Sequence, residues 1–122
     1  MKPIIVDCDS ADVVDLFDYH PEDPEDFGFQ LTLTIGIEGQ KGADNFQLMV
    51  ATPKHIQKIH PNQSAVLLRH YLVVFRYDFN VILDVISKYI RSIEEDTWEK
   101  VAEKIGRVAQ WEFEDYKPYQ PY

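Results

Sequence analysis

The sequence predicts an α+β fold in which a mainly antiparallel sheet is covered on one face by two C-terminal helices. Two observations carry this prediction. Residues 27–52 alternate apolar and polar side chains as a long hairpin does. After residue 78, apolar residues recur at intervals of three and four, as in amphipathic helices. The chain has 122 residues, 45% of them hydrophobic and 27% charged, so we expect one compact domain over residues 1–122.

The first predicted element is a short strand at residues 3–8, with residues 4–6 in the core. The single cysteine, Cys8, is expected to pack beside them as a small apolar residue. An irregular acidic loop follows over residues 10–26, with one helical turn predicted near residues 12–17. Apolar side chains in this loop would anchor it and so hold its carboxylates in a fixed pattern.

The hairpin at residues 27–52 has the strongest strand signal in the chain. Its first half, FGFQLTLTIGIEG, alternates strictly, and the alternation resumes at residues 46–50 after the polar loop EGQKGADN. Thr52 followed by Pro53 fits the N-cap and first position of a helix. We expect that helix to be short and to end near residue 59.

The last third of the chain predicts one more strand and two helices. Residues 70–77, HYLVVFRY, are almost continuously apolar, which favours a strand in a central place in the sheet. Asp78 can cap the first helix, and Asp96 with Glu99 resembles a capping box for the second. Gly106 is expected to weaken the second helix without ending it. The apolar stripes are Phe79, Ile82, Ile86, Tyr89 and Ile93 in the first helix, and Trp98, Val101, Ala102, Ile105, Val108 and Ala109 in the second.

The net charge of −9 is concentrated in one segment. Residues 7–26 contain nine acids and no Lys or Arg, whereas the other residues carry twelve acids and twelve bases. A solvated loop is one interpretation, but so one-sided a block also favours a basic partner. The lack of clustered Lys and Arg argues against nucleic-acid binding. The short apolar runs and the absence of a signal-like start predict no membrane association and a cytoplasmic protein.

The stretch IIVDCDSADVVD resembles a carboxylate active site, but three known patterns of this kind do not fit it. A dehalogenase-type phosphatase needs a parallel α/β core, which this sequence does not predict. In the nucleoside-hydrolase calcium motif, Pro-Gly stands where this chain has Ser10 and Ala11. A helix-loop-helix calcium loop counted from Asp7 fails at its fifth and sixth positions, Ala11 and Asp12. We therefore expect no enzyme, no catalytic residue, no cofactor and no metal ligand; the alternative is a small metal- or ligand-binding domain that uses the Asp-rich loop 7–26.

Four stretches of the chain carry a resemblance to one known family: PEDPEDFGFQL (21–31), IGIEGQKGADNFQLMVATPK (35–54), RHYLVVFRYD (69–78) and TWEKVAEKIGRVAQWEFEDY (97–116). In their order and spacing, the chain as a whole resembles the immunity protein 8 family of bacterial polymorphic-toxin systems. The resemblance implies a small cytoplasmic inhibitor that neutralises the toxin made by its own cell, and it supplies no catalytic residues. The chain departs from the family in the unusually acidic residues 4–19 and in the end, YKPYQPY.

The resemblance and the charge together predict a partner. We expect the C-terminal toxin domain of a contact-dependent growth inhibition or related system, with a basic nuclease favoured, and ribonuclease ahead of deoxyribonuclease. An acidic surface could mimic the phosphate backbone that such a toxin holds. Apolar anchors would be needed as well, and Phe17, Tyr19, Tyr119 and Tyr122 are candidates, while Trp111 and Phe113 should dock on the body. The candidate toxin-binding residues are Asp9, Asp12, Asp15, Asp18, Tyr19, Glu22, Asp23, Glu25 and Asp26.

Overall fold

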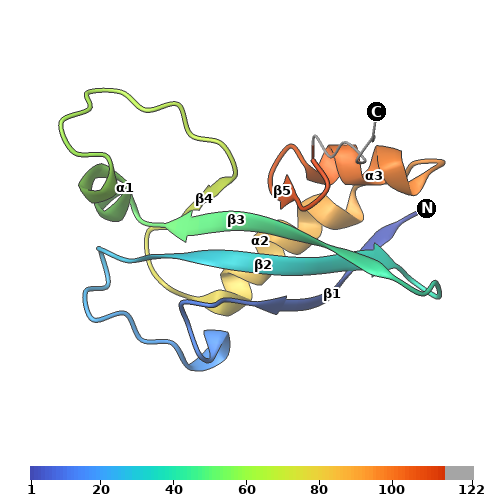
Figure 1. Cartoon of the computed structure of the whole chain (residues 1–122). Helices are drawn as coiled ribbons and strands as arrows, with labels where there is room; N and C mark the ends of the chain where they lie inside the picture. The colour runs from blue at the N-terminus through green and yellow to red at the C-terminus, as the bar shows by residue number, and fades with distance from the viewer. Residues whose placement is uncertain (115–122) are drawn as a thin grey trace, which may run out of the picture.

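The computed structural model describes residues 1–114 and confirms the predicted α+β fold (Figure 1). In this part of the chain, a five-stranded sheet carries two C-terminal helices, and a shorter helix follows the hairpin. No helix within it is long and apolar enough to cross a membrane. The elements are β1 (Pro3–Asp9), the 3₁₀ helix η1 (Leu16–Asp18), β2 (Gly28–Ile37), β3 (Ala43–Ala51), α1 (Pro53–Ile59), β4 (Tyr71–Val73), α2 (Phe79–Arg91), α3 (Trp98–Ile105) and β5 (Gln110–Trp111).

The sheet has the strand order β1-β2-β3-β4 and is mainly antiparallel. The predicted hairpin is confirmed, since β2 and β3 pair without a break from Gly28 opposite Ala51 to Gly36 opposite Ala43. Two short strands share the far edge of β3. There β4 pairs in parallel with residues 49–51, and β5 pairs antiparallel with residues 46–47.

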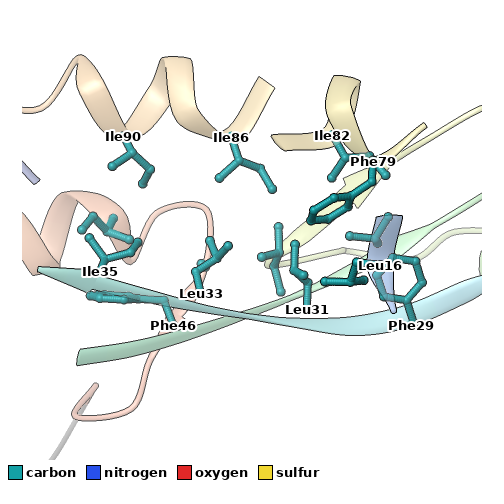
Figure 2. Packing of buried hydrophobic residues seen from close by; sticks show 14 of the residues in the cluster. Leu16, Phe29, Leu31, Leu33, Ile35, Phe46, Phe79, Ile82, Ile86 and Ile90 are labelled. Carbon is teal, nitrogen blue, oxygen red and sulfur yellow. The ribbon is translucent and has the colours of Figure 1, made fainter. Parts of the chain in front are cut away.

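The core lies between one face of the sheet and the two C-terminal helices. Alternation along β2 and β3 places their apolar side chains on this face, as the sequence predicted. Figure 2 shows α2 lying along it, with its isoleucines directed at the sheet. Burying each such side chain stabilises the fold by about 1.5–3 kcal/mol. The side chains that Figure 2 labels in this core are Leu16, Phe29, Leu31, Leu33, Ile35, Phe46, Phe79, Ile82, Ile86 and Ile90.

A strand within the predicted range 70–77 is confirmed, but it is shorter than predicted and is not central. β4 covers only Tyr71–Val73 and lies at the edge of the sheet. Its pairing cannot extend towards the N-terminus because β5 occupies the next positions of β3. After Val74, the chain leaves the sheet to begin α2 at Phe79, so Phe75 is left exposed. An apolar run had suggested burial on both faces, but part of this run faces solvent.

The helix caps were predicted correctly in two of three cases. Thr52 caps α1 and Asp78 caps α2. The Asp78 carboxylate accepts hydrogen bonds from the backbone N–H groups of Asn80 and Val81. For α3, however, the cap is Thr97 rather than Asp96, and its hydroxyl accepts from the N–H of Lys100 at 3.3 Å. Its end also differs from the prediction, because α3 stops at the C-cap residue Gly106.

β1 confirms the predicted strand but not its full burial. Ile5 packs against the core, as does Cys8. Val6 is 60% exposed because the register of β1 against β2 shifts between Ile5 and Asp7, a β-bulge that turns Val6 outward. The prediction that residues 4–6 all lie in the core therefore holds only for Ile5, because Ile4 is half-buried outside the core cluster and Val6 faces solvent.

Candidate functional site

The acidic segment, defined as residues 7–26, is attached to the body near its middle by neutral contacts. Val13 and Leu16 are buried, each 7% exposed, which confirms that apolar side chains anchor the segment. Figure 2 shows Leu16 at the end of the core formed by Phe29 and Phe79. The Tyr77 hydroxyl donates a hydrogen bond to the carbonyl oxygen of Leu16. The predicted helical turn exists as η1, but it is shorter than the predicted range 12–17 and lies at the end of that range, at Leu16–Asp18.

Several carboxylates of the segment fix its backbone. Asp12 Oδ2 accepts a hydrogen bond from the N–H of Gln30 in β2 at 2.9 Å. Asp15 caps η1 by accepting from the N–H of Phe17 at 3.0 Å. Such local side-chain-to-backbone bonds stabilise turns that the chain would otherwise adopt only transiently. The carboxylates therefore sit in a defined arrangement on the surface.

The N-terminal half of the acidic segment, residues 7–18, carries charge without compensation. Asp7 and Asp9 pair with Thr34 and Thr32 on either side of the inward-facing Cys8, so they project from the open face of the sheet. Asp18 lies 3.5 Å from the exposed His20. Among residues 1–114, no Lys or Arg lies within ion-pair distance of the five aspartates in this half.

The C-terminal half, residues 19–26, is held differently. Asp26 is 14% exposed and lies 3.3 Å from both His55 and Lys58 of α1. Asp23 lies 3.5 Å from Lys54, also in α1. The N–H of Glu25, which donates to Asp23, and the nearby Lys54 hold the pKa of the Asp23 carboxyl below its usual value. Two of the four acids in this half are thus offset by cations of the same chain.

Tyr19, one of the candidate toxin-binding residues, is half-buried in a group of aromatic rings. Its ring meets that of Tyr77 edge to face at 4.9 Å, and those of Phe27 and Phe29 at 6.3 and 5.8 Å. Burial raises the pKa of Tyr19, and burial together with neighbouring Tyr19 and Asp15 raises that of Tyr77 to about 12. Tyr19 thus helps to attach the acidic segment. Two further anchor candidates, Tyr119 and Tyr122, lie outside the described residues.

The structure adds Asp7 to the candidate residues. The sequence placed Asp7 in the acidic block of residues 7–26 but not among the candidate toxin-binding residues, yet strand register places it on the same face as Asp9. The alternation around Cys8 was the signal that could have identified it. Within the described ranges, no three His, Cys, Asp or Glu side chains are placed to hold a metal ion. Burial, and then the charges of Asp7 and Asp9, raise the pKa of Cys8, which disfavours the reactive thiolate.

The C-terminal aromatic residues dock as predicted. Trp111 stacks on Phe46 with ring centroids 6.4 Å apart, and Phe113 meets Trp111 edge to face. The indole N–H groups of Trp98 and Trp111 both donate to Asp44 Oδ2, at 2.8 and 3.0 Å. Residues 111–113 are therefore attached to the body through Phe46 and Asp44.

Comparison with known proteins gives one result. The family model described as immunity protein 8 matches residues 5–116. No curated protein and no solved structure matches the chain. The matched range contains the whole acidic segment and all the described elements except the first two residues of β1.

Proposed function

The chain belongs to the immunity protein 8 family, a family of toxin-neutralising proteins, and from that premise we propose that it blocks its cognate toxin with the acidic segment. The N-terminal half of the segment lies over the basic active-site region of the toxin and takes the place of a phosphate backbone. The protein acts by binding rather than by catalysis. It does so in the cytoplasm, where the toxin would meet its target.

One observation carries this proposal: five aspartates that no described Lys or Arg offsets are presented by a segment whose backbone is fixed. A fixed pattern of charge suits a rigid cleft better than a mobile tail does, because less conformational entropy is lost on binding. Opposite fields also steer encounter, and association can then reach about 10⁸–10⁹ M⁻¹s⁻¹ at low salt. Fast capture is useful to an inhibitor that must act before the toxin does.

The proposed partner is the C-terminal toxin domain of a contact-dependent growth inhibition or related polymorphic toxin system. Its chemistry should be that of a nuclease, with ribonuclease favoured. A nuclease cleft is basic because it binds phosphate, and this basic surface is what the acidic segment would complement. Of the candidate residues, Asp9, Asp12, Asp15 and Asp18, with Asp7 added, are the first choice for contact. Glu22 and Glu25 come next, and Asp23 and Asp26 are already paired with α1.

Co-expression with the toxin encoded beside the gene is the direct test. Cells that make both proteins in soluble form should survive, and cells that make the toxin alone should die. Death of the co-expressing cells would contradict immunity itself.

The role of the acidic segment is tested by charge reversal at aspartates whose side chains accept no backbone hydrogen bond within residues 1–114, unlike those of Asp12 and Asp15. The variant Asp7→Lys, Asp9→Lys, Asp18→Lys should lower the association rate by roughly 10- to 100-fold at low salt and flatten its salt dependence. The matched control, Glu38→Lys, Glu99→Lys, Glu103→Lys, makes the same change in net charge at exposed acids elsewhere. An equal loss in both variants would mean that net charge matters and that the acidic segment is not the binding surface.

A further inference from the structure

A second surface, which we call the β4–α2 groove, lies beside the acidic segment. One wall is formed by residues 72–78, which include the end of β4 and the link to α2. The other wall consists of Val81, Ile82 and Val85, in the first turns of α2. The groove has a volume of about 680 Å³, enough for one or two large side chains.

The groove exposes apolar side chains that the fold does not cover. Phe75 is 80% exposed, Val81 57%, Val85 48% and Val73 41%. Single exposed apolar residues are ordinary, but several gathered around one hollow mark a surface that another molecule covers. Val73 and Phe75 lie in the apolar run that the sequence predicted as a central strand. Their exposure follows from the shortness of β4 and its place at the edge.

Phe75 is held in a fixed position by anchors on both sides. Before it, the N–H of Val74 donates to the carbonyl oxygen of Ala51 at 3.0 Å, and the Val74 side chain is buried. After it, Tyr77 donates to Leu16, and Asp78 caps α2. Because the backbone is fixed on both sides of Phe75, only the rotation of its side chain is lost on binding, and a large aromatic residue on a fixed backbone is typical of binding hot spots.

The groove is continuous with the acidic segment. The contact between Tyr77 and Leu16 joins the wall of the groove to η1. The Phe17 ring lies edge to face on Phe79, the first residue of α2, at 4.9 Å, and Phe17 itself is exposed. An apolar surface thus borders directly on the uncompensated aspartates.

The charges around the groove indicate what kind of segment it would accept. Acidic groups dominate its surroundings: Asp78 lies in its wall, while Asp15 and Asp18 lie on the adjoining η1. Arg76 is the cation that lines it. A segment with an apolar side chain flanked by Lys or Arg would complement this arrangement, whereas an acidic segment would be repelled.

We propose that the β4–α2 groove receives an apolar side chain of the cognate toxin domain, from a segment that carries basic residues on either side of it. This rests on the proposed function and divides the work of binding in two. The acidic segment governs the rate of encounter, because its charges act at a distance. The groove governs the lifetime of the complex, because an apolar anchor must leave its pocket before the partners separate.

Substitutions on exposed groove residues test this division. Phe75→Ser and Val85→Ser, made separately, should each raise the dissociation rate from the catalytically inactivated toxin domain, by roughly tenfold or more for Phe75. The association rate and its salt dependence should remain as in the wild type. Leu67→Ser is the matched control, since Leu67 is 102% exposed on the loop before β4 and outside the groove, and it should change neither rate. Melting temperatures establish that each variant is folded. If Phe75→Ser or Val85→Ser does not fold, Val81→Lys, in the same groove, is tested in its place.

Each outcome has a distinct meaning. In the first outcome, the wild type binds the toxin, charge reversal in the acidic segment slows association, and the variants at Phe75, Val81 and Val85 dissociate at the wild-type rate. The groove proposal is then overturned and the proposed function stands. If the wild type does not bind the toxin at all, both proposals fall. If sedimentation shows a dimer that Phe75→Ser dissociates, the groove belongs to a second copy of this chain, and the proposal is again overturned.

Discussion

The two halves of the acidic segment are both rich in acids but are attached to the body differently. Residues 7–18 are anchored mainly by neutral groups, the buried side chains of Val13 and Leu16 and the hydroxyl of Tyr77, and the Asp12 carboxylate accepts from a backbone N–H of β2 rather than pairing with a cation. In residues 19–26, Tyr19 also packs against aromatic rings, but Asp23 and Asp26 form ion pairs with α1. Neutral anchoring leaves charge free for a partner, whereas ionic anchoring uses it within the chain.

The number of acidic residues in a segment therefore overestimates the negative charge that is available to a binding partner. Each aspartate that pairs with a lysine of the same chain contributes little to the field at a distance, because the two charges nearly cancel there. The candidate binding surface is therefore better defined by its anchors than by its composition. The following predictions test the comparison.

Removing the neutral anchor should have the largest effect. Leu16→Ala leaves a cavity against Phe29 and Phe79 and should lower the free energy of unfolding by about 2–5 kcal/mol. Urea denaturation measures the change. Val14→Ala is the control, because Val14 lies two residues before Leu16 in the chain and is fully exposed. A comparable loss in both variants would show that Leu16 is not the anchor.

Breaking the ionic anchor should have a smaller effect on stability and little on binding. Asp26→Asn removes the charge that faces His55 and Lys58 and should lower the free energy of unfolding by about 1–2 kcal/mol. Its association rate with the toxin should stay within roughly twofold of the wild type, whereas Asp18→Asn should lower that rate by roughly two- to fivefold. The comparison breaks down if Asp26→Asn is the slower of the two in stopped-flow association.

The sequence predicted those features that depend on local pattern. The alternation from Phe27 onward predicted the hairpin, and Thr52 and Asp78 predicted two helix caps, because each signal lies within a few residues of the structure it determines. The edge position of β4 could not be predicted in this way. It depends on β5, which pairs with the neighbouring positions of β3 and lies about forty residues after β4 in the chain.

The candidate site was predictable to the same extent. The segment and its lack of bases are plain in the sequence. The division of its acids into free and paired ones depends on Lys54 and Lys58, which reach Asp23 and Asp26 only after the hairpin has returned the chain. The exposure of Phe75 could not be foreseen either, because a run of apolar residues predicts burial wherever the run lies.

Tyr77 gives a third test, on the neutral anchor alone. Tyr77→Phe keeps the ring but leaves the Leu16 carbonyl without its donor, which should cost about 1 kcal/mol at neutral pH. Folding raises the pKa of Tyr77 to about 12. Its phenol therefore stays protonated in the folded protein at pH values above about 10, where the same phenol in the unfolded chain has begun to ionise. Wild-type stability should therefore decline as the pH rises from about 10 towards 12, and the decline should be smaller in Tyr77→Phe. Equal declines in alkaline denaturation would assign the effect to other groups.

Asp23 gives the smallest effect and tests the ionic anchor. The donated N–H of Glu25 and the Lys54 charge favour its carboxylate in the folded state, so its folded pKa lies below the usual 3.8. That stabilisation is present above the usual pKa and is lost as the pH falls through the lower folded value. Asp23→Asn keeps an acceptor for the N–H of Glu25 but has no charge to lose. The difference in free energy of unfolding between wild type and variant should therefore shrink as the pH falls from about 5 to about 2, measured by denaturation at each pH. A difference that does not depend on pH would mean that α1 does not hold this half of the segment by charge.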